Sequence, residues 1–217
     1  MASTLELHLD PCTVNSRKVL AALSHLQTPY TLHKMSYFAG DHKAPSYLKI
    51  NPCGTVPCAV VDKSLTLTES NAIILYAAKL AGDTPAYPSD PKKRADINRW
   101  LFWEASVWFA SCYVYLVQNV AAPLLGGQPD AEILKAQEPR WRELAGVLEG
   151  RLGDTGKWIC GESVTVADLS VAASVHLWRK QRFPLQDFPQ VQRWIADVEG
   201  LQCWRETQGP VDEALGG

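Results

Sequence analysis

The run PCTVNSRKV carries the densest set of reactive side chains in the first part of the chain. It follows a short apolar segment and leads into an apolar stretch with helical spacing. It holds a thiol, two hydroxyls, an amide and two cations, at Cys12, Thr13, Ser16, Asn15, Arg17 and Lys18. A thiolate would be a nucleophile, whereas hydroxyl and amide donors at a helix start could hold an anion. Either the protein's own sulfur or a bound anionic group could therefore be the reacting centre.

Two further stretches carry polar groups where predicted elements begin. The run NPCGTVP precedes an apolar strand, and LTESNAI passes from a strand into a helix that starts near Glu69 and Ser70. A helix N-terminus favours a negative charge, so Ser70 and the first backbone N–H groups of this helix could receive a carboxylate. The alternative is that both residues only cap the helix.

These groups are positioned by a predicted mixed α/β segment. Strands are expected at 5–9, 30–35, 56–61 and 64–67, helices at 14–27 and 69–80, and a loop at 36–44. A helix between the first two strands predicts that they are parallel. The turn Asp62–Lys63 predicts an antiparallel hairpin between the last two strands. The order is β-α-β-β-β-α, a βαβ unit followed by a ββα unit.

The rest of the chain has a helical pattern. Residues 82–91 are rich in proline and predict a linker. Long helices are expected from Pro91 through an aromatic run and over 130–151, with another after Pro189. Thr165 and Asp168 are spaced as a capping box at a further helix start. The expected domains are 1–81, the linker 82–91, and an all-helical domain 92–217, which gives an α+β fold.

Composition narrows the function classes. The formal net charge is −2, so no general attraction to nucleic acid or to an anionic membrane is expected. Residues 1–80 hold seven Lys or Arg and five Asp or Glu, a net of +2 that suits a small anionic ligand there. Neither a secretory signal nor a membrane span is expected. The six cysteines form no C-x-x-C pair and are read as reduced thiols of a cytoplasmic protein without a metal site.

In order and spacing, PCTVNSRKV, GDHKAPSYLKINPCGTVPCAV, LTESNAI and GESVTVADLS resemble the glutathione transferase family over essentially the whole chain. The block around GDHK is most similar to the phi class and related bacterial or fungal enzymes, and T-x-N resembles the nu class. The resemblance implies a thioredoxin-like N-terminal domain, a helical C-terminal domain and a homodimer.

The resemblance also implies a glutathione site. Pro57 would be a cis proline that lets the backbone of Val56 pair with the cysteinyl segment of glutathione. Ser70 would bind the γ-glutamyl carboxylate and Glu69 the ammonium group. His42 and Lys43 would reach the glycine carboxylate, with a solvated loop as the alternative.

Glutathione chemistry needs the thiolate, and a free thiol with a pKa of about 8.5 is mostly protonated at pH 7. Alignment of the helix start with other transferases places Thr13 at the catalytic hydroxyl position, with Asn15 second. Cys12 is the rival, because a mixed disulfide with glutathione would make the protein a thiol transferase. A turn without chemistry is the remaining alternative.

The aromatic helix that follows Pro91 is expected to line an apolar electrophile site with Trp108, Cys112 and Tyr115, although aromatic residues at helical spacing are often plain core. The predicted function is conjugation of glutathione, as co-substrate, to apolar electrophiles in detoxification, with no metal required. The alternatives are a glutathione-dependent thiol transferase, peroxidase or isomerase, or a non-catalytic glutathione-binding protein.

Overall fold

The computed structural model describes residues 4–216 and divides them into two compact units. One unit runs up to Thr84 and takes in the chain from Gln202 onward, and the other spans Pro85–Leu201. The elements of the first unit are β1 (Leu5–Leu9), α1 (Val14–His25), β2 (Thr31–Lys34), a 3-10 turn η1 (Asp41–Lys43), α2 (Pro45–Leu48), β3 (Cys58–Val61), β4 (Leu65–Leu67), α3 (Ser70–Ala81), α11 (Gln202–Arg205) and α12 (Gly209–Ala214).

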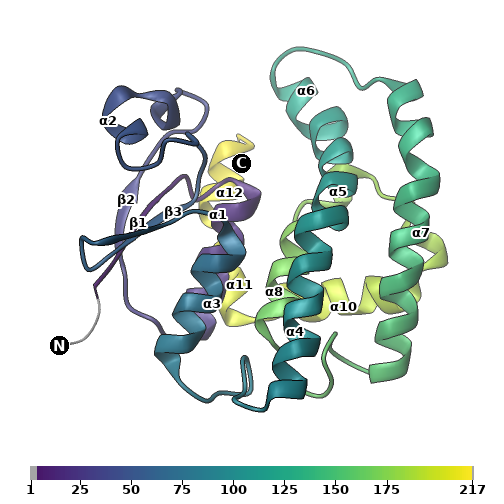
Figure 1. Ribbon diagram of the computed structural model, residues 1–217. Helices are drawn as coiled ribbons and strands as arrows, with labels where there is room; N and C mark the ends of the chain where they lie inside the picture. The colour runs from purple at the N-terminus through teal and green to yellow at the C-terminus, as the bar shows by residue number, and fades with distance from the viewer. Residues whose placement is uncertain (1–3, 217) are drawn as a thin grey trace. The chain divides into compact units, whose positions relative to one another are not determined.

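The sheet of this unit is mixed, with the strand order β2-β1-β3-β4. β1 is parallel to β2 and antiparallel to β3, and β3 and β4 form the predicted hairpin. Asp62 and Lys63 both have positive φ, at 48° and 56°, as a tight primed turn requires. The predicted thioredoxin-like arrangement is confirmed (Figure 1).

Alternation along β1 explains how the sheet is buried. Leu5, Leu7 and Leu9 are almost fully buried on one face, where α1 and α3 lie (Figure 1). Glu6 and His8 point to the opposite face, because successive strand residues alternate. The Tyr47 ring of α2 lies 6.1 Å from the His8 ring, so α2 belongs to that second face.

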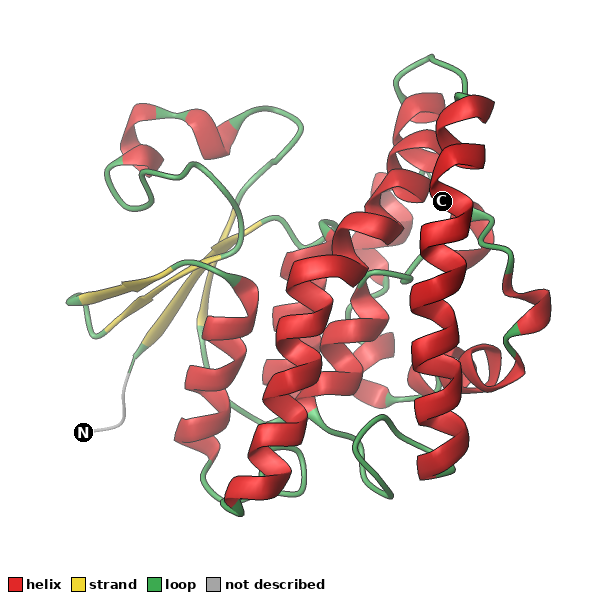
Figure 2. Cartoon of the chain, turned by 45° about the vertical axis from the view of Figure 1, so that its right-hand side comes forward, coloured by secondary structure: helices red, strands yellow, loops and turns green. Residues whose placement is uncertain are grey.

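The helical unit contains α4 (Pro91–Trp103), a π-helical segment η2 (Glu104–Trp108), α5 (Phe109–Leu116), a second π-helical segment η3 (Val117–Ala121), α6 (Ala122–Leu124), α7 (Ala131–Thr155), α8 (Val166–Ala173), α9 (Trp178–Gln181), a 3-10 turn η4 (Leu185–Asp187) and α10 (Pro189–Glu199). Figure 2 shows the helices of the chain in red and its strands in yellow, and all four named strands belong to the other unit. Thr165 is the N-cap of α8, and its backbone N–H donates to Asp168 Oδ2 at 2.9 Å, as the capping-box pattern predicts.

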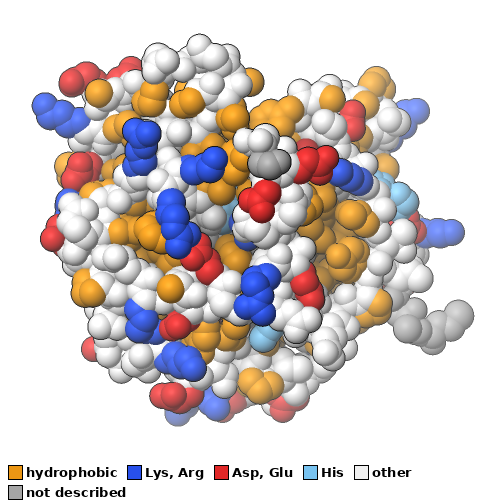
Figure 3. Space-filling model, turned by 180° about the vertical axis from the view of Figure 1, so that it is seen from behind, with side chains coloured by type: hydrophobic (Ala, Val, Ile, Leu, Met, Phe, Trp, Pro, Cys, Tyr) orange, Lys and Arg blue, Asp and Glu red, His pale blue; other side chains and the backbone are white. Residues whose placement is uncertain are grey.

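The continuous helical stretch Pro91–Leu124 is long and apolar enough to cross a membrane by length and composition alone. The sequence predicts no such segment. The core helix of a helical bundle meets the same criteria, and this stretch contacts α7 and α8 within its own unit. On the face drawn in Figure 3, Lys and Arg side chains are interspersed with Asp and Glu, in keeping with the small net charge.

The end of the chain differs from the expected domain 92–217. Residues from Gln202 onward belong to the first unit, because Arg17 of α1 binds them. Arg17 is fully buried and donates to Thr207 Oγ1 at 3.0 Å and to Gln208 Oε1 at 2.6 Å. The periodicity of apolar residues in a segment can identify a helix. It does not show which distant helix packs against that segment.

Candidate functional site

Strand register brings the ends of three segments of the first unit together. His8 of β1 pairs with Cys58 of β3, so Val56–Pro57 lies beside the turn that follows β1. Ala59 pairs with Leu67 of β4, and this pairing places the start of α3 next to the same position. The runs PCTVNSRKV, NPCGTVP and LTESNAI therefore meet at one edge of the sheet.

The N-termini of α1 and α3 are in direct contact at this edge. Ser70 Oγ lies 3.4 Å from Asn15 Oδ1, a long hydrogen bond between residues 55 positions apart. Because Oδ1 accepts from Ser70, the Asn15 Nδ2 group is directed elsewhere, and it has no hydrogen-bond partner among residues 4–216. The first N–H groups of each helix also lack intrahelical acceptors. The contact thus concentrates hydrogen-bond donors where an anion could bind.

Thr13 is the N-cap residue of α1, and local contacts occupy its hydroxyl. Thr13 Oγ1 lies 3.0 Å from the carbonyl oxygen of Asp10 and 2.7 Å from Ser16 Oγ. A hydroxyl has one proton to donate. In this structure the Thr13 hydroxyl donates its proton within the turn. The hydroxyl would have to rotate before it could donate to a bound sulfur.

Asp10 organises the turn, a role that sequence reasoning missed. Its side chain is buried, and it accepts the backbone N–H of Cys12 at 3.1 Å and that of Tyr37 at 2.8 Å. The position directly after a strand and before Pro11 was a signal for a turn-forming aspartate. The carboxylate fixes the backbone that presents Thr13 and Asn15.

Burial raises the pKa of the Cys12 thiol to about 12, and the neighbouring Asp10 carboxylate adds to the effect. A reactive cysteine needs the opposite environment, which stabilises the thiolate. Cys12 is therefore held as a neutral thiol at neutral pH.

The loop before Pro57 holds a backbone N–H and C=O that could bind a ligand. Val56 and Pro57 are joined by a cis peptide bond, as the resemblance implies. Tyr47 Oη and Asn51 Nδ2 both donate to the carbonyl oxygen of Thr55, at 2.5 and 2.9 Å. The N–H and C=O of Val56 make no hydrogen bond within residues 4–216. Asn51 is fully buried, and its structural role was also missed by the sequence reasoning.

His42 and Lys43 lie in η1, above this loop. Lys43 Nζ donates to the carbonyl oxygen of Gly54 at 2.8 Å, so the ammonium group is held against the loop. The His42 ring stacks on Tyr37 with centroids 4.3 Å apart. Its Nδ1 is buried without a hydrogen-bond partner among the described residues. Lys43 and His42 therefore border the loop that holds Val56.

Glu69 precedes α3 in a conformation that is rare for a residue with a side chain. Its φ is 66° and its ψ is 114°. Such conformations cost about 1–3 kcal/mol and occur often where a ligand is held. The exposed side chain leaves the carboxylate open to solvent at the edge where Ser70 and Asn15 meet.

The aromatic residues expected at an electrophile site are core residues of the helical unit. Trp108 is fully buried, and its Nε1 donates to the carbonyl oxygen of Val171 at 3.1 Å. Cys112 and Tyr115 are also buried, and the Tyr115 ring packs 4.8 Å from the Phe183 ring. Their packing inside the unit favours the alternative, plain core, over the expected ligand contact.

The fold and this edge define a class of protein: a thioredoxin-like domain with hydrogen-bond donors gathered at one edge of its sheet, carried by a chain with a helical second domain. Residues 14–80 match the family model for the glutathione S-transferase N-terminal domain, and residues 108–201 match the model for the C-terminal domain. The chain belongs to the glutathione S-transferase family.

Curated relatives span most of the chain. Glutathione S-transferase F13 of Arabidopsis thaliana is 32% identical over 89% of this chain and 90% of its own length. Glutathione S-transferase D7 of Drosophila melanogaster is 30% identical over 89% of this chain and 84% of its own length. Glutathione transferase F7 from Populus trichocarpa superposes with a TM-score of 0.86 at 25% identity and covers 95% of this chain and 99% of that one.

Proposed function

We propose that this chain is a phi-like glutathione transferase that holds the thiol of glutathione as a thiolate and conjugates it to apolar electrophiles. The observation that carries the proposal is the contact between Asn15 and Ser70, which joins two helix N-termini beside the free backbone groups of Val56. An extended anionic peptide with a thiol at its centre matches this arrangement of donors.

Glutathione would lie along this edge of the sheet with its γ-glutamyl end at α3 and its glycine end at Lys43. The α3 N-terminus and Ser70 would bind its γ-glutamyl carboxylate, and the exposed Glu69 would pair with its ammonium group. The N–H and C=O of Val56 would pair with the cysteinyl residue as an added strand. Lys43 has three donors, so it can keep its bond to Gly54 and still bind the glycine carboxylate beside His42.

The cysteinyl sulfur would then face the start of α1. We assign Asn15 as the first donor to sulfur, because its Nδ2 needs no rearrangement to donate. Thr13 would be the second donor, after its hydroxyl proton turns away from Asp10. A drop of two units in the thiol pKa requires about 2.7 kcal/mol, which two donors and the α1 N-terminus can supply.

The thiol-transferase alternative relies on Cys12 as the nucleophile. Its raised pKa opposes that role, since attack on a disulfide requires the thiolate. The proposal also includes a cytoplasmic homodimer with a role in detoxification, with glutathione and a small electrophile as its ligands and no nucleic acid or membrane as partner.

A turnover panel tests this function. Purified protein is assayed with glutathione and an aryl halide, an isothiocyanate, an organic peroxide and a mixed disulfide, alongside Cys12→Ser as the matched variant. We expect conjugation of the aryl halide by both proteins. Retention on immobilised glutathione without any turnover would instead establish a non-catalytic binding protein, and activity on the disulfide alone, lost in Cys12→Ser, would establish a thiol transferase.

A further inference from the structure

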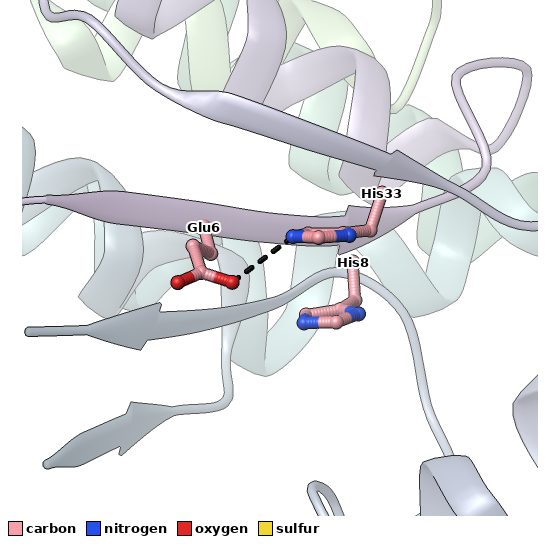
Figure 4. A group of neighbouring side chains, drawn as sticks. All are labelled: Glu6, His8 and His33. Atoms are coloured by element: carbon pink, nitrogen blue, oxygen red, sulfur yellow. Dashed lines mark hydrogen bonds and ion pairs between the residues drawn. The ribbon is translucent and has the colours of Figure 1, made fainter. Parts of the chain in front are cut away.

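The outer face of the sheet brings together three metal-ligating side chains that are distant in sequence. In the parallel pairing of β1 with β2, His8 lies opposite His33 and Glu6 opposite Thr31. Paired residues on neighbouring strands point to the same face, and Glu6 lies two residues before His8 on that face. Figure 4 shows the two imidazole rings one above the other, with the carboxylate of Glu6 beside them.

The geometry of the three side chains is compact. The two rings are stacked with centroids 4.5 Å apart and an interplanar angle of 10°. His33 Nε2 lies 3.0 Å from Glu6 Oε2. One ligand atom from each of the three residues lies within 4.8 Å of the other two.

We propose that Glu6, His8 and His33 bind one divalent transition-metal ion of the zinc type on the outer face of the sheet. Imidazole nitrogens and a carboxylate oxygen are preferred ligands of such ions, and two histidines with one glutamate is a known zinc ligand set. Water completes the coordination at the position that the protein leaves open. The site is separate from the proposed glutathione site, because its ligands point to the face opposite α1.

Modest side-chain motion brings the ligands to bonding positions. Zinc bonds of about 2.0–2.2 Å place neighbouring ligand atoms of a tetrahedral site roughly 3.3 Å apart. The pair Glu6–His33 already meets that spacing, and the ring of His8 must turn toward it. The side chains of His33 and Glu6 are 43% and 30% exposed, so these two ligands can also adjust toward the ring of His8.

The cysteine spacing predicts no metal site, but it carries no information about histidines on neighbouring strands. His8 and His33 are 25 positions apart and carry no ligand motif, so the cluster appears only once the register of β1 and β2 is known. A one-residue shift of that register would place His33 on the opposite face of the sheet.

Zinc titration of the reduced, chelator-free protein by isothermal calorimetry tests the site. We expect one equivalent of zinc to bind, with affinity weakened by at least about tenfold in His8→Ala and in His33→Ala. His25→Ala removes a histidine elsewhere, and Cys53→Ser removes an exposed competing thiol. Both controls should bind zinc like the unmodified chain.

Circular dichroism of each variant confirms that it folds. Glu6→Gln keeps the size of the side chain and gives an independent measure if an alanine variant unfolds, because the amide is a weak zinc ligand. The proposal is overturned if the unmodified protein binds no zinc. It is equally overturned if His8→Ala and His33→Ala, or Glu6→Gln in their place, bind zinc with unchanged affinity.

Discussion

The guanidinium carbon of Arg17 lies 4.4 Å from the ring centroid of Trp204, and both side chains are buried. The contact joins the third residue after Val14, where α1 begins, to α11 near the end of the chain. Arg17 also donates to Thr207 and Gln208, so one side chain ties the C-terminal segment to the helix that carries Asn15. The end of the chain thereby becomes part of the proposed glutathione-binding unit.

Arg17→Met should destabilise the protein by about 2–4 kcal/mol, because it removes charge-assisted hydrogen bonds and a cation–π contact from a buried position. Chemical denaturation monitored by tryptophan fluorescence measures the loss. Ser24→Ala is the matched control, since it removes an exposed bond between α1 and Glu206. This control should lower the free energy of unfolding by no more than about 1 kcal/mol. If both variants lose the same free energy of unfolding, the buried contacts of Arg17 stabilise the protein no more than the exposed bond of Ser24 does.

Asn15→Ala should raise the pKa of bound glutathione by about one unit and lower turnover near neutral pH roughly tenfold. The reason is the loss of the donor that we place closest to sulfur. A pH titration of thiolate absorbance in the binary complex measures the pKa directly. Thr13→Ala should act in the same direction, and Thr13→Ser should restore activity because it keeps the hydroxyl.

The Thr13 hydroxyl bonds Ser16 in the turn and is proposed to donate to the bound sulfur. Ser16→Ala separates these two roles. Loss of the Ser16 hydroxyl removes one local partner of Thr13 and leaves the thiol donors in place. Its thiol pKa should therefore stay near that of the unmodified enzyme. If Asn15→Ala and Thr13→Ala both leave the pKa of bound glutathione unchanged, neither residue stabilises the thiolate.

The thiol of Cys12 should resist alkylation in the folded protein. Burial raises its pKa to about 12, so folding favours the neutral form. At pH 8 iodoacetamide should modify the exposed Cys53 well before Cys12, as peptide mass analysis would resolve.

The same raised pKa has a defined effect on stability. The folded state keeps the proton of Cys12 while the unfolded state loses it, so the contribution of this group to stability falls as pH rises from about 9 to about 12. Cys12→Ala should flatten that part of the stability profile. Rapid modification of Cys12 at pH 8 in the native protein would contradict the raised pKa.

The sequence predicted the elements whose signals are local. A short apolar run located β1, turn residues located the hairpin at Asp62, and the spacing of Thr165 and Asp168 located the start of α8. Each of these depends on neighbours within a few positions. The order of strands and helices predicted a βαβ unit followed by a ββα unit, and the family resemblance implied the thioredoxin-like arrangement.

Contacts over long sequence distances were beyond such reasoning. Arg17 could not be connected with Trp204, nor His8 with His33, because neither pair leaves a local pattern. Trp108 shows the related difficulty for burial: helical spacing identifies a face but not the surface that covers it, and here that surface is the helical core itself. Asp10 was overlooked although its position after β1 and before Pro11 is typical of a turn-forming aspartate.

The backbone of Glu69 allows binding to be separated from strain. Glu69→Ala removes the carboxylate and keeps the unfavourable φ of 66°, whereas Glu69→Gly removes both. We expect both variants to lose affinity for glutathione by a similar factor, because both lack the partner of the ammonium group. Calorimetric titration with glutathione measures that affinity.

Only Glu69→Gly should also gain stability, by about 1 kcal/mol, since glycine adopts positive φ without steric cost. Thermal unfolding of the two variants in parallel gives the difference between them. A gain in stability with unchanged glutathione affinity would leave the strained backbone explained by packing of α3 and would remove Glu69 from the ligand site. The expected result is loss of glutathione affinity in both variants and a gain of stability in the glycine variant alone. That result would show that the backbone conformation which presents the Glu69 carboxylate lowers the stability of the fold.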